Sequence, residues 1–544
     1  MALETGGDII ERFNWLKSGR GIFENTWTEI ANEELGLRNF NLTHAIGEQR
    51  HKRIYDTTAL SAGMLLASTM HGLITNPGAP FHQTVVPRGI RDIGENNDYL
   101  VYLDETMDML YKDERFGFPT AATEFYIDYI FFGTAGMFTA DVPGVGPVDF
   151  ARPLGELVVD ESKDDKVDTV FRIYEVSPRQ FIQEFGPGVH PPTDREAEKS
   201  GGGSINVKML HLVHPRSDID PRSKLSKGRP FRSVHIVHDD KTIVRESGSH
   251  SDPWQVARWG KEAGERYGRG PGWQALPDSQ TANEMRRIML ESGQSSINPA
   301  LLVPDDGILT QVDTSPRALV VYRAGAFDKD GIRNMPQGDA SPITIEVVQA
   351  VQAQIQQRFF AHLLNLFDEG VPTATQALEM ESKAARILVS TVSRAAAEFA
   401  SKSLRRKFDV ASRAGMFEPP PETLNQVPIQ IRYLSPIMKS QRQMQTRATL
   451  NTYAAAGQMA QFHPDIIDNF DGDAAIREIA EAEGMNLGNL NSVTTVAQQR
   501  QARAQIEQAQ QQQAQQAQQA ENIGKALPAL TAAAEAQAPR PAQQ

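Results

Sequence analysis

Residues 344–367, TIEVVQAVQAQIQQRFFAHLLNLF, predict a helix with two chemically distinct faces. Apolar side chains recur at spacings of three and four, the pattern of one buried helix face: Val348, Val351, Ile355, Phe359 and Leu363. The opposite side carries neutral amides, with Arg358 as the nearby charge: Gln349, Gln352, Gln354, Gln356 and Gln357. This amide face is either the solvent side of an ordinary amphipathic helix, or a wall past which a polyanion moves without being held. Amides lack the charge with which lysine binds phosphate.

A second helix and an insert precede this one. The segment Leu276-Pro277-Asp278 leads into a predicted short helix that ends near Gly293, with Asp278 as its N-cap. Residues 298–342 follow, and their many prolines and glycines predict short strands and turns. The sequence therefore predicts a helical hairpin that carries a compact β insert at its tip.

A long helix is expected downstream, after the acidic turn at residues 368–374. It runs from Thr375 to about Ala414 and ends at Gly415 and the following prolines. At 1.5 Å per residue it would reach roughly 60 Å. A basic cluster lies near its end, and it is either a DNA contact or a solvated, acid-paired face: Lys402, Arg405, Arg406 and Lys407.

The remaining segments predict an α+β protein that is mainly helical. The first 140 residues show helical periodicity, whereas residues 140–260 contain short β-branched runs between turn-forming residues. One more strand is expected at residues 427–433, and residues 436–489 are expected to be helical again. Residues 493–520 are rich in Gln and Ala, which favour helix but bury little, so this segment would be frayed in a single copy and ordered by identical neighbours.

Composition excludes several classes of protein. The net charge of −13 over 544 residues argues against a basic nucleic-acid clamp. There is no cysteine, which excludes disulfides and thiolate sites and suits synthesis in a reducing cytosol. We expect a soluble protein without a signal peptide, because no apolar run approaches the ~20 residues of a membrane helix. The best candidate, Phe125–Phe138, is short and carries Asp128.

Motifs for catalysis, metals and cofactors fail on their spacing. No phosphate-binding loop is present, and the glycine-rich segment Gly268–Gly272 is interrupted by proline, which favours a loop at a packing contact. The histidines of the pairs at 211/214 and 235/238 point to opposite faces of their strands, and Asp471-Gly472-Asp473 lacks the other ligands of a calcium loop. We therefore predict no catalytic residue, no metal and no cofactor.

Three groups of segments resemble one known family. The segment RIYDTTALSAGMLLASTMHGLITNP at residues 53–77 resembles the N-terminal signature of the head-to-tail connectors, or portal proteins, of short-tailed bacteriophages. So do ARWGKEAGERYGRGP at 257–271, followed by ALPD at 275–278, and GVPTAT at 370–375, followed by the long helix and residues 415–421. They occur across most of the chain in the order of the family. One departure is Gln376-Ala377, where the family commonly has Glu-Val.

The resemblance implies a ring-forming portal fold with a β-rich wing and clip. On this chain its parts would be a wing at 1–276, stem helices at 277–296 and 344–367, a clip at 297–343, a tunnel loop at 368–374, a long wing helix and return strand at 375–433, a crown at 434–490, a Gln/Ala-rich barrel helix at 491–526 and a disordered tail at 527–544. Residues expected to line the channel are Gln349, Gln352, Gln356, Asp368, Glu369 and Val371.

The resemblance also implies a function. Twelve copies would form a channel at the capsid vertex of the virion, for packaging and ejection of double-stranded DNA, after synthesis in the host cytoplasm. Twelve helices, each ~10 Å wide, would enclose an opening of roughly 28 Å, enough for a duplex. Expected partners are the terminase large subunit, tail adaptor and nozzle proteins, the major capsid protein, scaffold and internal core proteins.

Two other classes of protein stay open from the sequence. One is a different ring-forming virion component, such as a head-tail adaptor or tail-tube protein. The other is a nucleic-acid enzyme whose site carries no recognisable motif.

Overall fold

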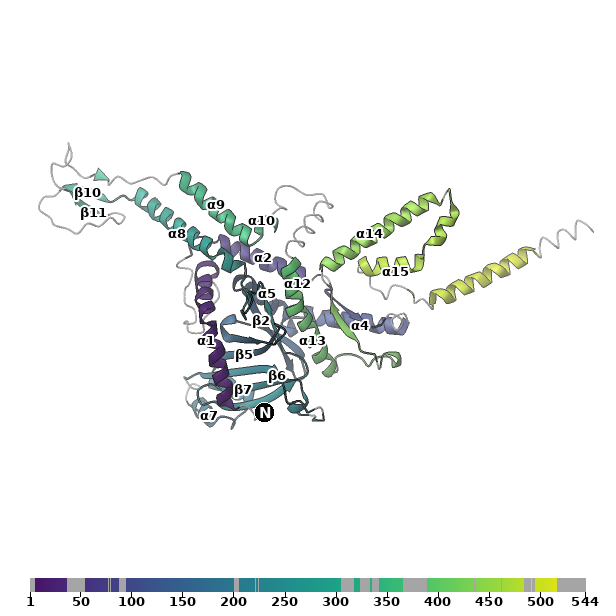
Figure 1. The fold of residues 1–544 in the computed structure, drawn as a ribbon, viewed down its shortest axis with the longest axis horizontal. Coiled ribbons are helices and arrows are strands. Elements are labelled where there is room, and N and C mark those ends of the chain that lie inside the picture. Colours follow the sequence, from purple (N-terminus) through teal and green to yellow (C-terminus); the bar gives the residue numbers. More distant parts are fainter. Residues whose placement is uncertain are drawn as a thin grey trace, which may run out of the picture. The chain divides into compact units, whose positions relative to one another are not determined.

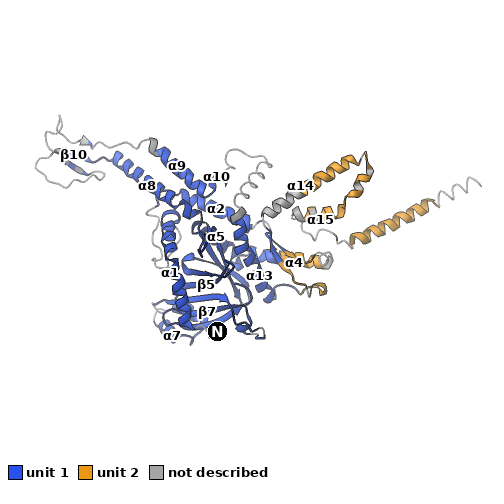
Figure 2. Ribbon diagram, in the orientation of Figure 1, with its two compact units in different colours: residues 1–83, 105–418, 431–444 blue, residues 84–104, 419–430, 445–544 orange. Residues whose placement is uncertain are grey.

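The structure is a computed structural model of the whole chain. It describes residues 5–36, 54–304, 318–322, 333–334, 342–364, 389–483 and 491–515, apart from 77, 79, 88–93, 200–204, 221, 224, 426, 435, 461 and 492–494. The described chain divides into two compact units, coloured separately in Figure 2. Unit 1 holds residues 1–83, 105–418 and 431–444, and unit 2 holds the rest. The mixture of helices and sheets confirms the α+β class.

Four helices form much of the N-terminal part, as the sequence predicted. They are α1 (Gly6–Ile30), α2 (Thr58–Ile74), α4 (Gly94–Lys112) and α5 (Phe118–Phe131). Helix α1 begins with a capping box, in which Thr5 accepts from the backbone of Asp8 and the Asp8 side chain accepts from the backbone of Thr5. A π-helical turn, Ala31–Leu35, continues α1 and ends at Gly36, which has a φ of 60°.

Two antiparallel sheets follow in unit 1. The larger has the order β4-β5-β6-β7-β8, with strands Leu157–Glu161, Val167–Val176, Val207–Pro215, Phe231–Val237 and Thr242–Ser249. The smaller has the order β3-β2-β9, with strands Gly146–Arg152, Thr134–Val142 and Trp254–Arg258. Two short helices, α6 (Pro178–Phe185) and α7 (Pro191–Ala197), lie between β5 and β6 in the chain. The expected antiparallel strands of this region are confirmed.

Helix α1 covers one face of the five-stranded sheet, as Figure 1 shows. Its buried residues include Ile9 and Phe13, which share a core with Phe171 of β5 and Leu210 of β6. The rings of Phe13 and Phe171 lie 5.8 Å apart. A second and larger core joins α2, α5, the three-stranded sheet and the long helix near the C-terminal end of unit 1.

The predicted helical hairpin is present, with corrected bounds. Its first helix, α8, runs from Pro271 to Ile297, and α9 runs from Pro342 to Arg358 beside it. The prediction that Asp278 caps the first helix is wrong, because the helix begins about two turns earlier, at the cap residue Gly270, and Pro277 lies inside it. The predicted end at Gly293 is also too early. Proline tolerated within the second turn explains the error, since proline usually marks a helix start.

Strands occupy the described parts of the insert. The order is β11-β10-β12, with strands Leu319–Tyr322, Leu301–Pro304 and Arg333–Asn334 respectively. Strands β10 and β11 are parallel, and β10 and β12 are antiparallel. Figure 1 shows β10 and β11 beyond the far end of α8.

The long helix is described from residue 389 onward. It consists of α12 (Val389–Ala395), a π-helical turn (Ala396–Ala400) and α13 (Ser401–Arg413). Its predicted end is confirmed, because Gly415 follows the cap residue Ala414 with a φ of 70°. The first third of the predicted helix, residues 375–388, lies outside the described residues. Strand β13 (Gln430–Tyr433) confirms the predicted return strand, and it pairs with β1 (His82–Val85).

Helices dominate the C-terminal region, as predicted. They are α14 (Pro436–Met459), a 3-10 segment (Pro464–Asn469) and α15 (Gly472–Glu483). Residues 495–515 form one more helix, whose side chains are exposed from residue 497 onward. The helix agrees with the helix propensity of Ala and Gln, and its fraying in a single copy stays a prediction. None of the described helices is both long and apolar enough to span a membrane.

Candidate functional site

The amide face of α9 is the first candidate surface. Gln349 and Gln356 are exposed, as a surface-lining role requires. Gln352 is only partly exposed, because its Nε2 donates a hydrogen bond of 2.6 Å to Oδ2 of Asp56, just before α2. Of the three glutamines singled out from the sequence, two thus present free amides to the surroundings and one ties α9 to the N-terminal part of unit 1.

The apolar face of α9 packs as the sequence predicted. Val348, Ile355 and Phe359 are buried, and Val351 packs at the edge of the main core. The Phe359 ring lies 5.6 Å from that of Phe131, at the end of α5. This packing fixes the rotation of α9 about its axis, so the glutamines at 349 and 356 must face away from the core.

The charge beside this face is neutralised within the hairpin. Arg358 Nε lies 3.5 Å from Oδ2 of Asp278 on α8. The side chain is half exposed, so the pair adds little stability, but it offsets the one positive charge near the glutamines. A phosphate group that approaches Gln349 or Gln356 therefore meets neutral hydrogen-bond donors, with the exposed Glu346 one turn before Gln349.

Helix α9 ends abruptly at a pair of phenylalanines. Phe360 has a φ of 57°, in the left-handed region that non-glycine residues seldom adopt, and it stops the helix before α10 (Ala361–Leu364). The predicted continuous helix to Phe367 is therefore interrupted at this point. The other expected channel residues, Asp368, Glu369 and Val371, lie outside the described residues.

The basic cluster on α13 is mostly turned inward. Arg406 is buried, and its guanidinium donates to the carbonyl of Thr139 at 3.3 Å and to Oγ of Ser251 at 3.2 Å. Lys402 donates to the carbonyl of Val167 at 3.0 Å, and only Arg405 is exposed.

The hypothesis of a DNA contact is thus corrected for Arg406, because its buried guanidinium donates its hydrogen bonds to Thr139 and Ser251 within the protein. Lys402 is also engaged, because its Nζ lies 3.3 Å from Oδ2 of Asp252. Lys407, the fourth member of the cluster, is fully buried and pairs with Asp149. The error arises because the four residues are close in sequence but lie on different sides of an amphipathic helix.

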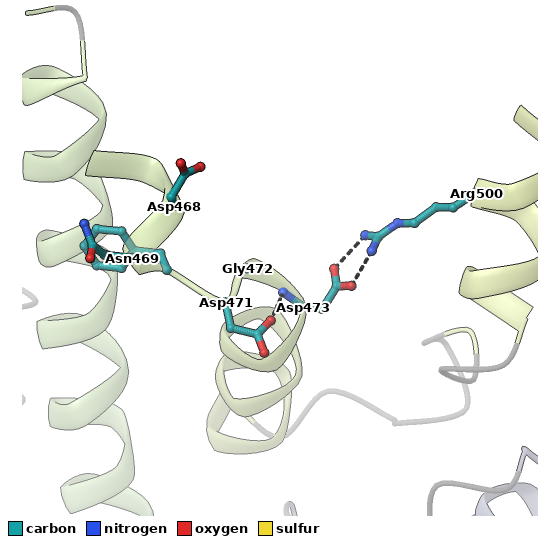
Figure 3. Close-up of a pocket in the computed structure, with 7 residues that line it drawn as sticks. Asp468, Asn469, Asp471, Gly472, Asp473 and Arg500 are labelled. Atoms are coloured by element: carbon teal, nitrogen blue, oxygen red, sulfur yellow. Dashed lines mark hydrogen bonds and ion pairs between the residues drawn. The ribbon is translucent and has the colours of Figure 1, made fainter. Parts of the chain in front are cut away.

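An open acidic pocket of about 630 Å³ lies at the start of α15, in unit 2 (Figure 3). The carboxylate of Asp471 points at the first turn of the helix and accepts from the backbone N–H groups of Asp473 and Ala474, both at 3.1 Å. Asp473 points the other way, into a two-pronged ion pair with Arg500 at 2.5 and 2.7 Å. Both carboxylates thus have partners, and the arrangement is a helix cap and a link to the helix at 495–515 rather than a cation site.

The remaining sequence motifs have structural explanations. Gly270 and Gly272 pack directly on α5, where an added Cβ would lie 2.4 Å from the carbonyl of Ile130 and 2.5 Å from that of Phe131. The glycine-rich segment is therefore a packing contact, as expected. Across the described part of the chain, no group of three or more His, Cys, Asp or Glu side chains could hold a metal ion.

Two histidines from different sequence pairs meet in the large sheet. His211 of β6 and His235 of β7 are register partners, and their rings stack at a centroid distance of 4.0 Å with an angle of 9°. Burial lowers the pKa of both, that of His235 to about 3, with the nearby arginines adding to the effect. Sequence spacing within each pair could not reveal this contact, because it depends on strand register.

Comparison with known proteins settles the family. A sequence profile described as "Bacteriophage head to tail connecting protein" matches residues 7–490. The chain belongs to this family. The connector family is the one that the segments at 53–77, 257–271 and 370–375 resemble, so that prediction is confirmed.

Two members of the connector family match over most of their length. A "Probable portal protein" of Bordetella phage BPP-1 is 25% identical over 490 residues, which cover 88% of this chain and 87% of the relative. A "Portal protein" of Salmonella phage epsilon15 is 24% identical over 492 residues, with the same coverage. Among solved structures, a chain of "Virion of native gene transfer agent (GTA) particle" covers 79% of this chain and 89% of its own length, at 11% identity and a TM-score of 0.33, which is too low to support a shared fold.

Proposed function

We propose that this chain is the subunit of a phage portal, a ring at the capsid vertex through which double-stranded DNA is packaged and later ejected. The observation that carries the proposal is the exposed face of neutral glutamines on α9, in a helical hairpin of a chain of the connector family. Two full-length relatives named as portal proteins support it.

The parts of a portal subunit map onto the observed elements. Helices α8 and α9 correspond to the proposed stem, the strands β10 to β12 to the clip at 297–343, and the two sheets with α1 to the wing. Helices α14 and α15 correspond to the crown at 434–490, and the helix at 495–515 to the barrel. The tunnel loop would be 368–374, and the tail 527–544.

Passive conduction is the proposed mechanism. Twelve hairpins would enclose an opening of roughly 28 Å, given ~10 Å for each helix. Gln349 and Gln356 would line it and form transient hydrogen bonds without the counterion release that makes lysine-rich surfaces bind DNA tightly. Asp368 and Glu369 would add repulsion at the narrowest point, beside Val371, so the duplex would slide there.

Partner proteins, rather than this chain, would move the DNA. In this proposal the clip provides the docking surface for the terminase large subunit during packaging, and for tail adaptor and nozzle proteins afterwards. The wing would contact the major capsid protein and scaffold, and the crown and barrel the internal core proteins. The subunit would be a structural component of the virion, without catalysis of its own.

Electron microscopy of the purified chain tests the proposal directly. Class averages viewed down the symmetry axis should show a closed ring of about twelve copies, the number that the resemblance to portal proteins implies, and a central hole of roughly 28 Å that admits a duplex. Native mass spectrometry of the same sample should give the matching multiple of 60.1 kDa. A stable monomer at micromolar concentration, or a ring without a pore, would count decisively against it.

A further inference from the structure

The base of the α8–α9 hairpin contains a cluster of polar side chains, which we call the hairpin joint: Glu33, Glu34, Asp56, Ser279, Asn283 and Gln352. They come from four places in the chain that are far apart in sequence, namely the π-helical turn after α1, the start of α2, α8 and α9. Polar groups inside a protein are costly unless they are bonded to one another. The joint is therefore a specific connection between the hairpin and the rest of unit 1.

Asn283 uses both ends of its amide in this joint. Its Oδ1 accepts from the backbone N–H groups of Tyr55, at 3.1 Å, and Asp56, at 2.9 Å. Its Nδ2 donates to the carbonyl and to Oε2 of Glu33, both at 3.1 Å. The side chain is 4% exposed, so water cannot readily replace these four bonds. One side chain of α8 thus holds both the end of the α1 segment and the start of α2.

Asp56 attaches the second hairpin helix to the same place. Its Oδ1 accepts from the backbone N–H of Thr58 at 2.9 Å, which satisfies the first turn of α2. Its Oδ2 accepts from Gln352 of α9 at 2.6 Å. Helices α8 and α9 therefore both bond to the short segment that leads into α2.

Glu34 is the least satisfied member of the joint. It is 1% exposed, its Oε1 accepts from Oγ of Ser279 at 2.9 Å, and its Oε2 has no hydrogen-bond partner among the residues that the structure describes. Space around that oxygen is tight, since a Cβ at Gly272 would lie 3.0 Å from it. An ionised carboxylate would be strongly disfavoured here, whereas a neutral carboxyl group fits.

We propose that the hairpin joint is a lock that sets the direction of α8 and α9 relative to the sheets, with Asn283 as its positioning residue and Glu34 as a proton-dependent element. The lock is closed while Glu34 keeps its proton. Ionisation places a charge in the joint that Ser279 alone cannot stabilise, and the neighbouring Glu33 repels it. The joint then opens, and α8 separates from the π-helical turn.

The groups around Glu34 favour its protonated form while the joint is closed. Burial raises the pKa of Glu34 well above its ordinary value of 4.5, the Ser279 hydrogen bond opposes this, and Glu33 adds to it. On the other side of Asn283, the pKa of Asp56 is lowered by its bonds to Thr58 and Gln352 and by Arg286 of α8, although burial opposes this. Asp56 thus stays ionised while Glu34 stays neutral, and a rise in pH changes the charge at Glu34 alone.

The consequence for DNA passage rests on the proposed function, whereas the joint itself does not. In a ring, a change in hairpin direction repeated in every subunit would alter the width of the opening between the glutamine faces. The joint would then couple the wing to the channel.

Pulsed electron paramagnetic resonance can measure the lock in the full-length chain. The protein has no cysteine, so Ser296→Cys at the exposed end of α8 and Thr242→Cys on β8 would take one spin label each without background. Doubly labelled chain mixed with an excess of unlabelled chain isolates the distance within one subunit. Buried glutamates titrate as high as about pH 8–9, so the unsubstituted joint should give a narrow distance distribution at pH 6 and a broader one at pH 9.

Variants separate the roles of the two residues. Glu34→Gln, which mimics the protonated form, should stay narrow at both pH values, and Asn283→Ala should be broad at pH 6 already. Glu284→Gln, an exposed change on the same helix, is the matched control and should titrate as the parent does. Broadening of Glu34→Gln to the same extent as the parent, or a narrow Asn283→Ala, overturns the proposal. If Asn283→Ala does not fold, the comparison of Glu34→Gln with the parent decides, and it does so whether or not the chain forms a ring.

Discussion

Lys407 and Asp149 form an ion pair of 2.7 Å in which neither side chain is exposed. The pair joins α13 to β3, and Lys407 also donates to the carbonyl of Leu110 at 2.8 Å and lies 4.0 Å from the centre of the Tyr111 ring. Burial lowers the pKa of Lys407, and Asp149 counteracts this. The end of the long helix is thus attached to the smaller sheet by a charge pair without access to water.

Removal of one residue of the Lys407–Asp149 pair should destabilise the protein. Lys407→Met leaves the Asp149 carboxylate buried and uncompensated, which typically destabilises a protein by about 3–5 kcal/mol. Denaturant unfolding of the variant should show this loss, and the double variant Lys407→Met, Asp149→Leu should recover much of it. A Lys407→Met protein as stable as its parent would show that the pair is not buried in solution.

Acid should weaken the large sheet through His211 and His235. Their folded-state pKa values are depressed, so the sheet favours neutral rings, and stability present above pH 6.5 is lost as the pH falls towards about 3. The stack faces Arg172 of β5 and Arg245 of β8, its register partners on either side, and these repel the protonated form.

Unfolding midpoints measured between pH 7 and pH 4 test this. His235→Phe removes one group that binds a proton on unfolding. The unfolding free energy should therefore depend less steeply on pH, by about 1.4 kcal/mol for each pH unit. Thr242→Ala, an exposed change on β8 that involves no titratable group, is the control and should leave the slope unchanged. An unaltered slope in His235→Phe would refute the assignment.

Lysines on the glutamine face should impede DNA. Gln349→Lys combined with Gln356→Lys would add two phosphate-binding charges to each subunit at exposed positions. Packaging in vitro should slow, and the defect should shrink as salt rises, because counterion release drives the added binding. Thr242→Lys, an exposed change on β8, is the control for net charge, and packaging at the parental rate by the double variant would remove these residues from the channel wall.

The contact of the glycine-rich segment with α5 should tolerate no side chain. Gly270→Ala would place a methyl group 2.4 Å from the carbonyl of Ile130, and overpacking of this kind costs about 1–3 kcal/mol. Gly293→Ala, inside α8 with nothing within 4 Å, should instead stabilise the helix by up to about 1 kcal/mol. Thermal unfolding of the two variants should therefore shift in opposite directions.

Periodicity predicted the elements of this fold better than their connections. The strands β5, β6 and β7 and the helices α4, α5 and α9 follow from local patterns of apolar residues, which the structure confirms. The start of α8 was misplaced because proline at 277 and aspartate at 278 form an ordinary helix-start signal, and only packing of the preceding turn on α5 extends the helix back to Pro271. The hairpin joint had no sequence signal at all, since Asn283 and Asp56 are 227 positions apart.

The exposure and the bonding partners of polar and charged side chains were the least predictable properties of the candidate site. Arg405 and Arg406 are adjacent, yet one is exposed and the other buried, because neighbouring residues on a helix point about 100° apart. Likewise, Gln352 looks equivalent to Gln349 and Gln356 in sequence, but only the fold brings Asp56 within reach of it.

The helix at residues 495–515 has consequences for how the chain melts. Its side chains are exposed from residue 497 onward, and a surface ion pair between Arg500 and Asp473 ties it to the preceding helices. A helix held by its own backbone hydrogen bonds unfolds gradually and at low temperature, independently of a packed core. Circular dichroism of dissociated subunits should accordingly show a broad early loss of helix, well before the cooperative unfolding transition of the sheets that calorimetry records.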